Sequence, residues 1–256
     1  MPDAWIDRVF AVMALAPQHT FLVLTKRPER MRRYLTDASA YCRVRHAADP
    51  LREWRPALGR IPINDPLYTA WWPQLWLGVT VEDQKRGAER RPALHALAGA
   101  GWRTFVSYEP ALGPVEWAGW EFLNWLTSGG ESGPNARPSH LDWHRAARDF
   151  SQANDIPYFF KQCGVFSDHG PAWGTAAGDC NDFDGCVFVG ADGGVHSKRE
   201  DSAPDARAMR RVGKRAAGRL LDGYEHDGIP IPIGRQYELN LHLTAPGRSP
   251  VLEAQA

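Results

Sequence analysis

Five short apolar runs, most of them followed by a helix-like segment, constrain the fold of this chain more than any other feature. The runs are TFLVLTKRP (20–28), LWLGVTVED (75–83), RTFVSYEP (103–110), WEFLNWLTSGGE (120–131) and IPYFFKQCG (156–164). A continuous apolar run such as the first is typical of a strand buried on both faces. Strands that alternate with helices form parallel βαβ units. The sequence therefore predicts an α/β protein whose parallel sheet is built from βα repeats.

The segments between the runs show helical spacing of apolar residues. Helices are expected over residues 3–16, 28–35, 85–101 and 139–155. Pro28 suits the first turn of the second helix, and Ser139 with Asp142 resembles a capping box at the start of the last one. Residues 37–74 hold several prolines and arginines without a clean period. We interpret this segment as a long excursion with a short helix, either a lid or an insertion.

Composition divides the chain into a core, an extension and a tail. The length of 256 residues suffices for one large α/β domain. We assign residues 1–164 to the core. Residues 165–223 are rich in Gly and Asp and form an extension of the same domain, with a hairpin over 186–197 and a basic helix over 209–223. Residues 224–256 are rich in Pro and Gly and are predicted to be a tail.

Charge and apolar content limit the partners. Lys+Arg and Asp+Glu are equal at 30 each, so the formal net charge is zero and gives no support to nucleic acid as a partner. Residues 213–219, together with Arg207, Arg210 and Arg211, indicate a basic helix that could still contact phosphates, although a solvated helix face explains these residues more simply. No apolar run is long enough to span a membrane and no start resembles a signal peptide, so we predict a cytoplasmic protein. The cysteines, four in all, indicate reduced thiols.

Every predicted strand ends in polar residues. The carboxyl ends of parallel strands share one edge of the sheet, and ligands bind there. The glycines would let the backbone approach a ligand closely, although an ordinary surface loop also explains Gly-Gly-Glu taken alone. The predicted ligand-binding residues are Thr25, Lys26, Arg27, Thr80, Glu82, Ser107, Gly129 and Gly130, and the candidate catalytic residues are Glu109, Glu131 and Lys161.

The side chains at this edge divide by charge. Lys26 and Arg27 would hold anionic groups, and the glutamates would meet amines, hydroxyls or a metal. Lys161 would donate a proton or bind phosphate. The expected ligand is therefore a small molecule or a nucleotide that carries charge.

Two other groups of residues contain possible metal ligands, but neither is predicted to bind a metal. Cys163, Cys180 and Cys186 match no common zinc spacing, and buried or free thiols explain them more simply. His140 and His144 are four residues apart and could bind a metal on one helix face. We interpret them as polar residues on the helix surface, and no metal site is predicted.

Several of these blocks, in this order, resemble a known family. The blocks TFLVLTKRPERM, LWLGVTVEDQ, FVSYEPALGPV, TSGGESGPNARPSH, IPYFFKQCG and GKRAAGRLLDG are similar to successive parts of the phage and prophage family of gene products thirty-seven and sixty-eight. They cover most of residues 1–223. The resemblance implies a divergent radical S-adenosylmethionine protein with an incomplete, TIM-like α/β barrel.

The resemblance also implies cofactors. Full-length members are expected to bind an iron–sulfur cluster through an N-terminal three-cysteine segment, together with S-adenosylmethionine. This sequence has no such segment and starts at what resembles an internal helix of the family, so a truncated relative of the enzyme with an unknown substrate is the leading expectation. The alternatives are a non-catalytic module that binds an anion or a nucleotide at the same edge, and an inactive prophage remnant.

Overall fold

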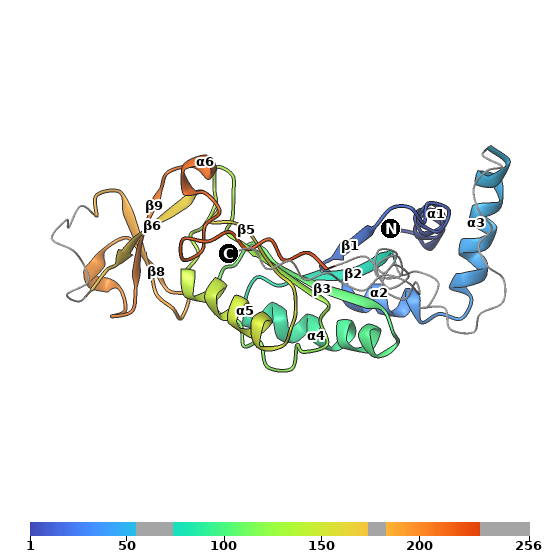
Figure 1. Cartoon of the computed structure of the whole chain (residues 1–256), viewed down its shortest axis with the longest axis horizontal. Helices are drawn as coiled ribbons and strands as arrows, with labels where there is room; N and C mark the ends of the chain where they lie inside the picture. Colours follow the sequence, from blue (N-terminus) through green and yellow to red (C-terminus); the bar gives the residue numbers. More distant parts are fainter. Residues whose placement is uncertain (55–73, 174–182, 231–256) are drawn as a thin grey trace, which may run out of the picture.

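A five-stranded parallel sheet forms the centre of the protein in a computed structural model, which describes residues 1–54, 74–173 and 183–230 (Figure 1). Its strands, in spatial as well as chain order, are β1 (Phe21–Thr25), β2 (Leu75–Thr80), β3 (Arg103–Tyr108), β4 (Trp125–Gly129) and β5 (Tyr158–Gln162). Every neighbouring pair is parallel. The prediction of an α/β fold with a parallel sheet is confirmed.

The sheet does not close into a barrel within the described part of the chain. β1 and β5 lie at opposite ends of the strand order and pair with only one strand each of this sheet. The TIM-like barrel implied by the resemblance is therefore not confirmed. The register still aligns the strand ends: Thr25 lies beside Val79, and Thr80 beside Ser107.

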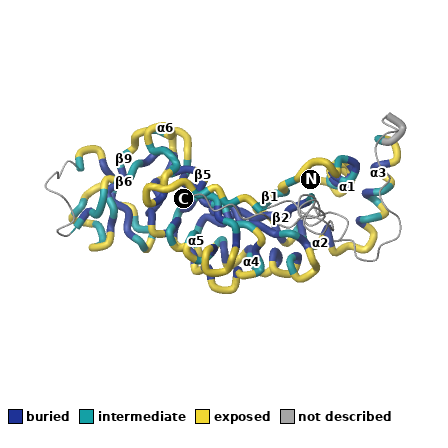
Figure 2. Tube along the Cα trace, viewed as in Figure 1, coloured by how far each residue is buried: buried dark blue, intermediate teal, exposed yellow. Residues whose placement is uncertain are grey.

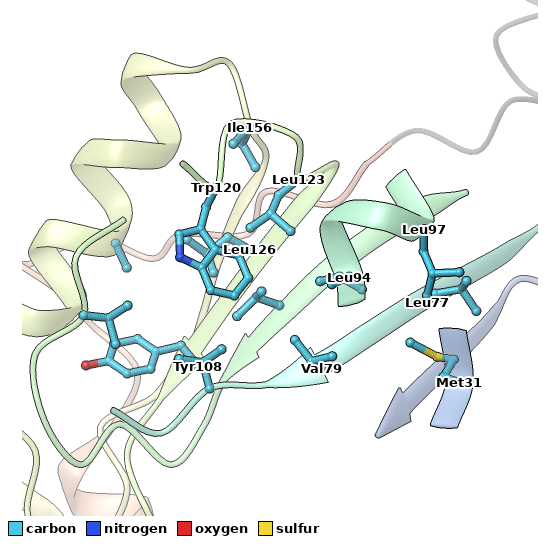
Figure 3. Packing of buried hydrophobic residues seen from close by; sticks show 14 of the residues in the cluster. Met31, Leu77, Val79, Leu94, Leu97, Tyr108, Trp120, Leu123, Leu126 and Ile156 are labelled. Atoms are coloured by element: carbon cyan, nitrogen blue, oxygen red, sulfur yellow. The ribbon is translucent and has the colours of Figure 1, made fainter. Parts of the chain in front are cut away.

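Helices cover one face of this sheet. α4 (Gln84–Gly99) packs against β2 and β3, and α5 (Leu141–Ala153) packs against β4 and β5 (Figure 1). Leu94 and Leu97 of α4 face Leu77 and Leu126 of the sheet (Figure 3), and all four are fully buried. Burying a leucine side chain contributes about 1.5–3 kcal/mol, so these contacts stabilise the packing of α4 on the sheet. The buried positions follow the sheet and the inner helix faces (Figure 2).

The remaining helices are α1 (Asp3–Ala14), α2 (Pro28–Leu35), α3 (Ala40–Trp54) and α6 (Lys214–Ala217), with a short 3₁₀ turn at Arg199–Asp201. α2 begins at Pro28 as predicted, because proline suits a first turn. α3, with 15 residues, is longer than the short helix expected within 37–74. The remainder of that predicted excursion, 55–73, lies outside the described residues.

The prediction that the first apolar run is buried on both faces is wrong. Leu22 is 50% exposed and Leu24 is 47% exposed, whereas all six residues of β2 are buried. β1 is an edge strand, whereas α4 packs mainly against β2 and β3, and α5 packs mainly against β4 and β5. An apolar run therefore predicts a strand here but not its place in the sheet.

The face of the sheet opposite α4 and α5 carries aromatic rings. Trp76, Phe105, Trp125 and Phe159 come from four different strands, and Trp125 lies 5.8 Å from Phe105 and 6.5 Å from Phe159 between ring centroids. Gly78 has no side chain because the Phe105 ring occupies the place where its Cβ would lie.

The extension after Gly164 forms a second, antiparallel sheet in the order β6–β9–β7–β8. Its strands are β6 (Phe166–Pro171), β7 (Cys186–Val189), β8 (Val195–His196) and β9 (Arg207–Arg211). β7 and β8 pair as a hairpin, which confirms the prediction for 186–197.

The basic helix predicted over 209–223 is wrong. Its first residues belong to β9, and α6 has only four residues. Gly213 and Gly218 flank α6 with φ values of 88° and 73°. A right-handed helix cannot continue through such positive φ values.

The start of the predicted tail contacts the sheet. The Phe160 amide donates to the His226 carbonyl at 2.9 Å, and the Gly228 amide donates to the Tyr158 carbonyl at 2.8 Å. Residues 226–228 thus run along the outer edge of β5, and residues 231–256 lie outside the described part. Among the described helices, none has the length and apolar character needed to cross a membrane.

Candidate functional site

The carboxyl edge of the parallel sheet gathers most of the residues that the sequence predicted. We use the word rim for the residues that gather around three glutamates at the carboxyl ends of these strands. Three glutamates lie on it, one each after β2, β3 and β4. Each of the three contacts at least one cationic side chain.

Glu82 is the buried member of the rim. Its Oε1 accepts from Lys26 Nζ at 2.5 Å and from Thr80 Oγ1 at 3.1 Å, and its Oε2 accepts from Arg90 Nη1 at 2.8 Å. Burial alone would raise the pKa of Glu82, but the bond from Lys26 and the charge of Arg90 outweigh it and lower the pKa below its ordinary value. The carboxylate is therefore ionised at neutral pH and joins β1, β2 and α4.

Glu109 joins β3 to β5. Its carboxylate accepts from Lys161 Nζ at 3.0 Å and from Gln162 Nε2 at 3.3 Å. Gly129 of β4 lies between them, since a Cβ at this glycine would lie 3.5 Å from the Glu109 carboxyl carbon and 3.5 Å from Lys161 Cβ. Lys161 remains 52% exposed, so its ammonium group is available to a ligand.

Glu131 lies on the glycine-rich loop 129–138, whose first residue, Gly129, is also the last residue of β4. Arg137 forms a bidentate ion pair with this carboxylate: Nε donates to Oε2 at 2.8 Å and Nη2 donates to Oε1 at 2.8 Å. The hydrogen bonds from Arg137 lower the pKa of Glu131. Gly130 has no side chain because a Cβ would overlap the Cys163 carbonyl. The loop thus approaches the end of β5 backbone to backbone.

Arg211 of β9 holds the middle of the same loop. Its guanidinium donates to the Ala136 carbonyl at 2.7 Å and to the Gly133 carbonyl at 3.3 Å. The second sheet therefore supports the rim, which the prediction of a basic helix missed. Arg90 and Arg137 were also missed as partners of the glutamates, because nothing in the sequence shows which cation meets which carboxylate.

Not every predicted residue joins the rim. Thr25 Oγ1 accepts from the Arg27 backbone amide at 3.0 Å. Both residues line an apolar groove of about 560 Å³ between α1, β1 and α2, away from the three glutamates. Ser107 is buried at the end of β3, where its carbonyl accepts from the Val81 amide at 2.9 Å. We therefore assign Thr25, Arg27 and Ser107 to the surroundings of the rim.

The prediction that His140 and His144 lie on the helix surface is wrong, because both are fully buried. His140 is the N-cap of α5, in place of the predicted Ser139, and its Nδ1 accepts from the Asp142 amide at 3.2 Å. His144 lies between Ser128 and Ser139, 3.1 Å from each hydroxyl. Burial lowers the pKa of His140, and it lowers the pKa of His144 to about 3.

The depressed pKa of His144 predicts acid sensitivity. Below pH 6.5, the ordinary pKa of histidine, His144 is protonated in the unfolded state but stays neutral in the folded state. The free energy of unfolding therefore falls as the pH falls from about 6.5 toward 3. Between pH 6 and pH 5 the wild type should lose about 1 kcal/mol more of its free energy of unfolding than the His144→Phe variant. Urea titrations at the two pH values measure this difference, and equal losses would contradict the assignment.

The cysteines do not assemble a metal site in the described residues. Cys42 is exposed on α3, Cys186 is buried in β7, and burial raises the pKa of Cys163 to about 11. Cys180 lies outside the described residues, so the three-cysteine alternative stays untested. In those ranges, no three side chains of His, Cys, Asp or Glu gather as metal ligands.

The fold and the rim define an α/β protein whose parallel sheet carries paired charges at its carboxyl edge. The chain belongs to the family described as "Protein of unknown function (DUF5131)", whose model matches residues 1–230. The match spans both sheets and every rim residue. Comparisons with curated proteins and with solved structures gave no match.

Proposed function

We propose that the rim binds a small ligand that carries both an amine and an anionic group, represented by S-adenosylmethionine, in a radical-SAM-like protein of unknown substrate. The observation that carries the proposal is the pairing of charge along the carboxyl edge. Glu82, Glu109 and Glu131 each lie against a cation. A ligand with both charges can replace an ion pair without leaving either protein group unpaired, and that avoids the cost of an uncompensated charge.

The pair of Glu109 and Lys161 is the centre of this proposal. Their side chains flank Gly129, where a Cβ would lie 3.5 Å from the Glu109 carboxyl carbon and 3.5 Å from Lys161 Cβ. The amine of the ligand would bind the Glu109 carboxylate and its carboxylate would bind the Lys161 ammonium group, both through charge-assisted hydrogen bonds. Lys26, with 62% of its side chain exposed, supplies a further cation beside Glu82.

The resemblance to the phage gene-product family supports S-adenosylmethionine as the first ligand to test. An iron–sulfur cluster does not fit the described residues, because cysteine thiolates hold such clusters and Cys42, Cys163 and Cys186 belong to three separate parts of the fold. We therefore derive no step through a cluster. The proposal concerns recognition of the ligand.

A non-catalytic nucleotide-binding module is the second candidate. The exposed ammonium groups of Lys26 and Lys161 favour it, because lysine is a good point-charge ligand for phosphate. The two candidates differ in the group that the glutamates must recognise. S-adenosylmethionine offers them an amine, whereas ATP offers the lysines a triphosphate.

Titration calorimetry with S-adenosylmethionine tests the proposal. Glu109→Gln removes the carboxylate charge and should weaken binding about tenfold or more, since a hydrogen bond to a charged group contributes about 1.5–3 kcal/mol. The matched control is Glu121→Gln, an exposed glutamate in the loop before β4, at the other end of the strands. The control should bind like the wild type.

The same titration distinguishes the alternatives. Binding of ATP but not S-adenosylmethionine, with loss on Lys161→Met, would favour the nucleotide-binding module. Wild-type protein that binds neither compound would overturn the proposed function. Equal weakening by the variants at Glu109 and Glu121 would show that the rim is not the site.

A further inference from the structure

A buried histidine connects the two ends of the loop that carries Glu131. Ser128 directly precedes residues 129–138 and Ser139 directly follows them. His144 Nδ1 lies 3.1 Å from Ser128 Oγ, and His144 Nε2 lies 3.1 Å from Ser139 Oγ. We infer that His144 is a positioning residue that holds both ends of this loop at the rim. The inference on the loop stands without the proposed function, and only its consequence for ligand binding rests on that proposal.

The hydrogen bonds around His144 admit one consistent arrangement of protons. The Tyr158 hydroxyl donates to the His144 carbonyl at 3.1 Å and lies 2.6 Å from Ser128 Oγ, so the Ser128 hydroxyl donates to Tyr158. Ser128 must then accept from His144 Nδ1–H. Nε2 of the neutral ring is left as the acceptor for the Ser139 hydroxyl. The Tyr158 hydroxyl, the Ser128 hydroxyl and the His144 ring then each donate one hydrogen bond and accept one, and the Ser139 hydroxyl donates one.

These hydrogen bonds are buried, so each of them needs its protein partner. Ser128 and His144 are fully buried and Ser139 is 2% exposed, so water cannot replace a missing partner, and an unpaired buried hydroxyl is costly. The His144 ring also packs between Phe160 at 5.0 Å and Tyr108 at 6.0 Å between ring centroids. The sheet therefore fixes the ring, and the ring fixes both ends of the loop.

The test compares two buried serines. Ser139→Ala removes the hydroxyl that ties the end of the loop to His144. Ser151→Ala is the matched control, because Ser151 is equally buried on α5 and donates to the Ala147 carbonyl at 2.8 Å without contacting the loop. Hydrogen exchange of peptides covering 129–138 should rise about tenfold in Ser139→Ala, the ratio for one lost hydrogen bond. The control should leave this exchange unchanged.

A double-mutant comparison separates positioning from general loosening. His144→Phe keeps the ring contacts and removes both hydrogen bonds, so adding Ser139→Ala to it should not raise loop exchange further. A further tenfold rise in that background would overturn the inference, as would equal loop exchange in Ser139→Ala and Ser151→Ala. If His144→Phe fails to fold, the two serine variants decide the question alone.

Ligand titration then separates this inference from the proposed function. If the wild type binds S-adenosylmethionine, Ser139→Ala should weaken binding while Ser151→Ala should not. If the wild type does not bind it but loop exchange rises only in Ser139→Ala, the proposed function fails and the role of His144 stands. If the wild type binds S-adenosylmethionine but loop exchange does not rise in Ser139→Ala, the role of His144 fails and the proposed function stands.

Discussion

Replacing Glu82 with alanine is expected to lower the free energy of unfolding by about 3–5 kcal/mol, the usual cost of removing one partner of a buried ion pair. Arg90 donates to the Glu82 carboxylate at 2.8 Å and also to the Thr80 carbonyl at 2.6 Å. The side chains of Arg90 and Glu82 are only 11% and 9% exposed. Without the carboxylate, the guanidinium stays buried with its charge uncompensated. Urea unfolding followed by tryptophan fluorescence measures the loss.

Two further variants show whether burial causes this loss. Glu29→Ala breaks an exposed pair with Arg32 on α2 and should change stability little, because exposed ion pairs contribute little. Arg90→Met added to Glu82→Ala removes the stranded charge and should recover part of the loss. If Glu82→Ala costs no more than Glu29→Ala, the Glu82 carboxylate does not hold the end of β2.

Replacing Gly164 with alanine is expected to cost about 3 kcal/mol. This glycine has φ of 83°, which costs an alanine about 1–2 kcal/mol. Its Cβ would also overlap the Glu131 carbonyl oxygen, which is backbone and cannot rotate away, and such overpacking adds about 1–3 kcal/mol. The overlap pushes the glycine-rich loop away from the end of β5, so ligand binding at the rim should fall together with stability.

Gly133→Ala is the matched control for Gly164→Ala. Gly133 lies in the same loop with φ of 112°, and nothing lies within 4 Å of the place where its Cβ would be. It should show only the cost of the strained backbone, and its variant should be more stable than Gly164→Ala. Thermal unfolding compares the two. Equal losses would mean that the loop can move away from the end of β5 without penalty.

Local patterns predicted the parts of the rim that depend on chain order. Residues that follow an apolar run lie at the carboxyl end of a strand, and parallel strands bring those ends to one edge. Lys26, Glu82, Glu109, Glu131 and Lys161 were found in this way. The groups that hold them were harder to predict, because Arg90 reaches Glu82 from helix α4, and Arg211, which holds the loop around Glu131, comes from a second sheet far away in the chain.

The errors have a common cause. Leu22 and Leu24 belong to an apolar run, but β1 is an edge strand and leaves them exposed. The spacing of His140 and His144 on a helix with many polar residues predicted that both lie on its exposed face. His144 instead forms hydrogen bonds with Ser128 and Ser139 inside the protein. Burial depends on which elements pack on a residue, and the spacing of residues along one element does not contain that information.

The amino-acid sequence was enough to predict the order of strands and helices in the parallel sheet and the polar edge where its strands end. These features follow from periodicity and from chain connectivity, which act over a few residues. Only the tertiary structure decided that the sheet stays open in the described residues, that each rim glutamate meets a cation, and that His144 holds the loop around Glu131. Those outcomes depend on how the elements pack against one another, and the energies of the resulting contacts depend on burial and on distances of a few ångströms.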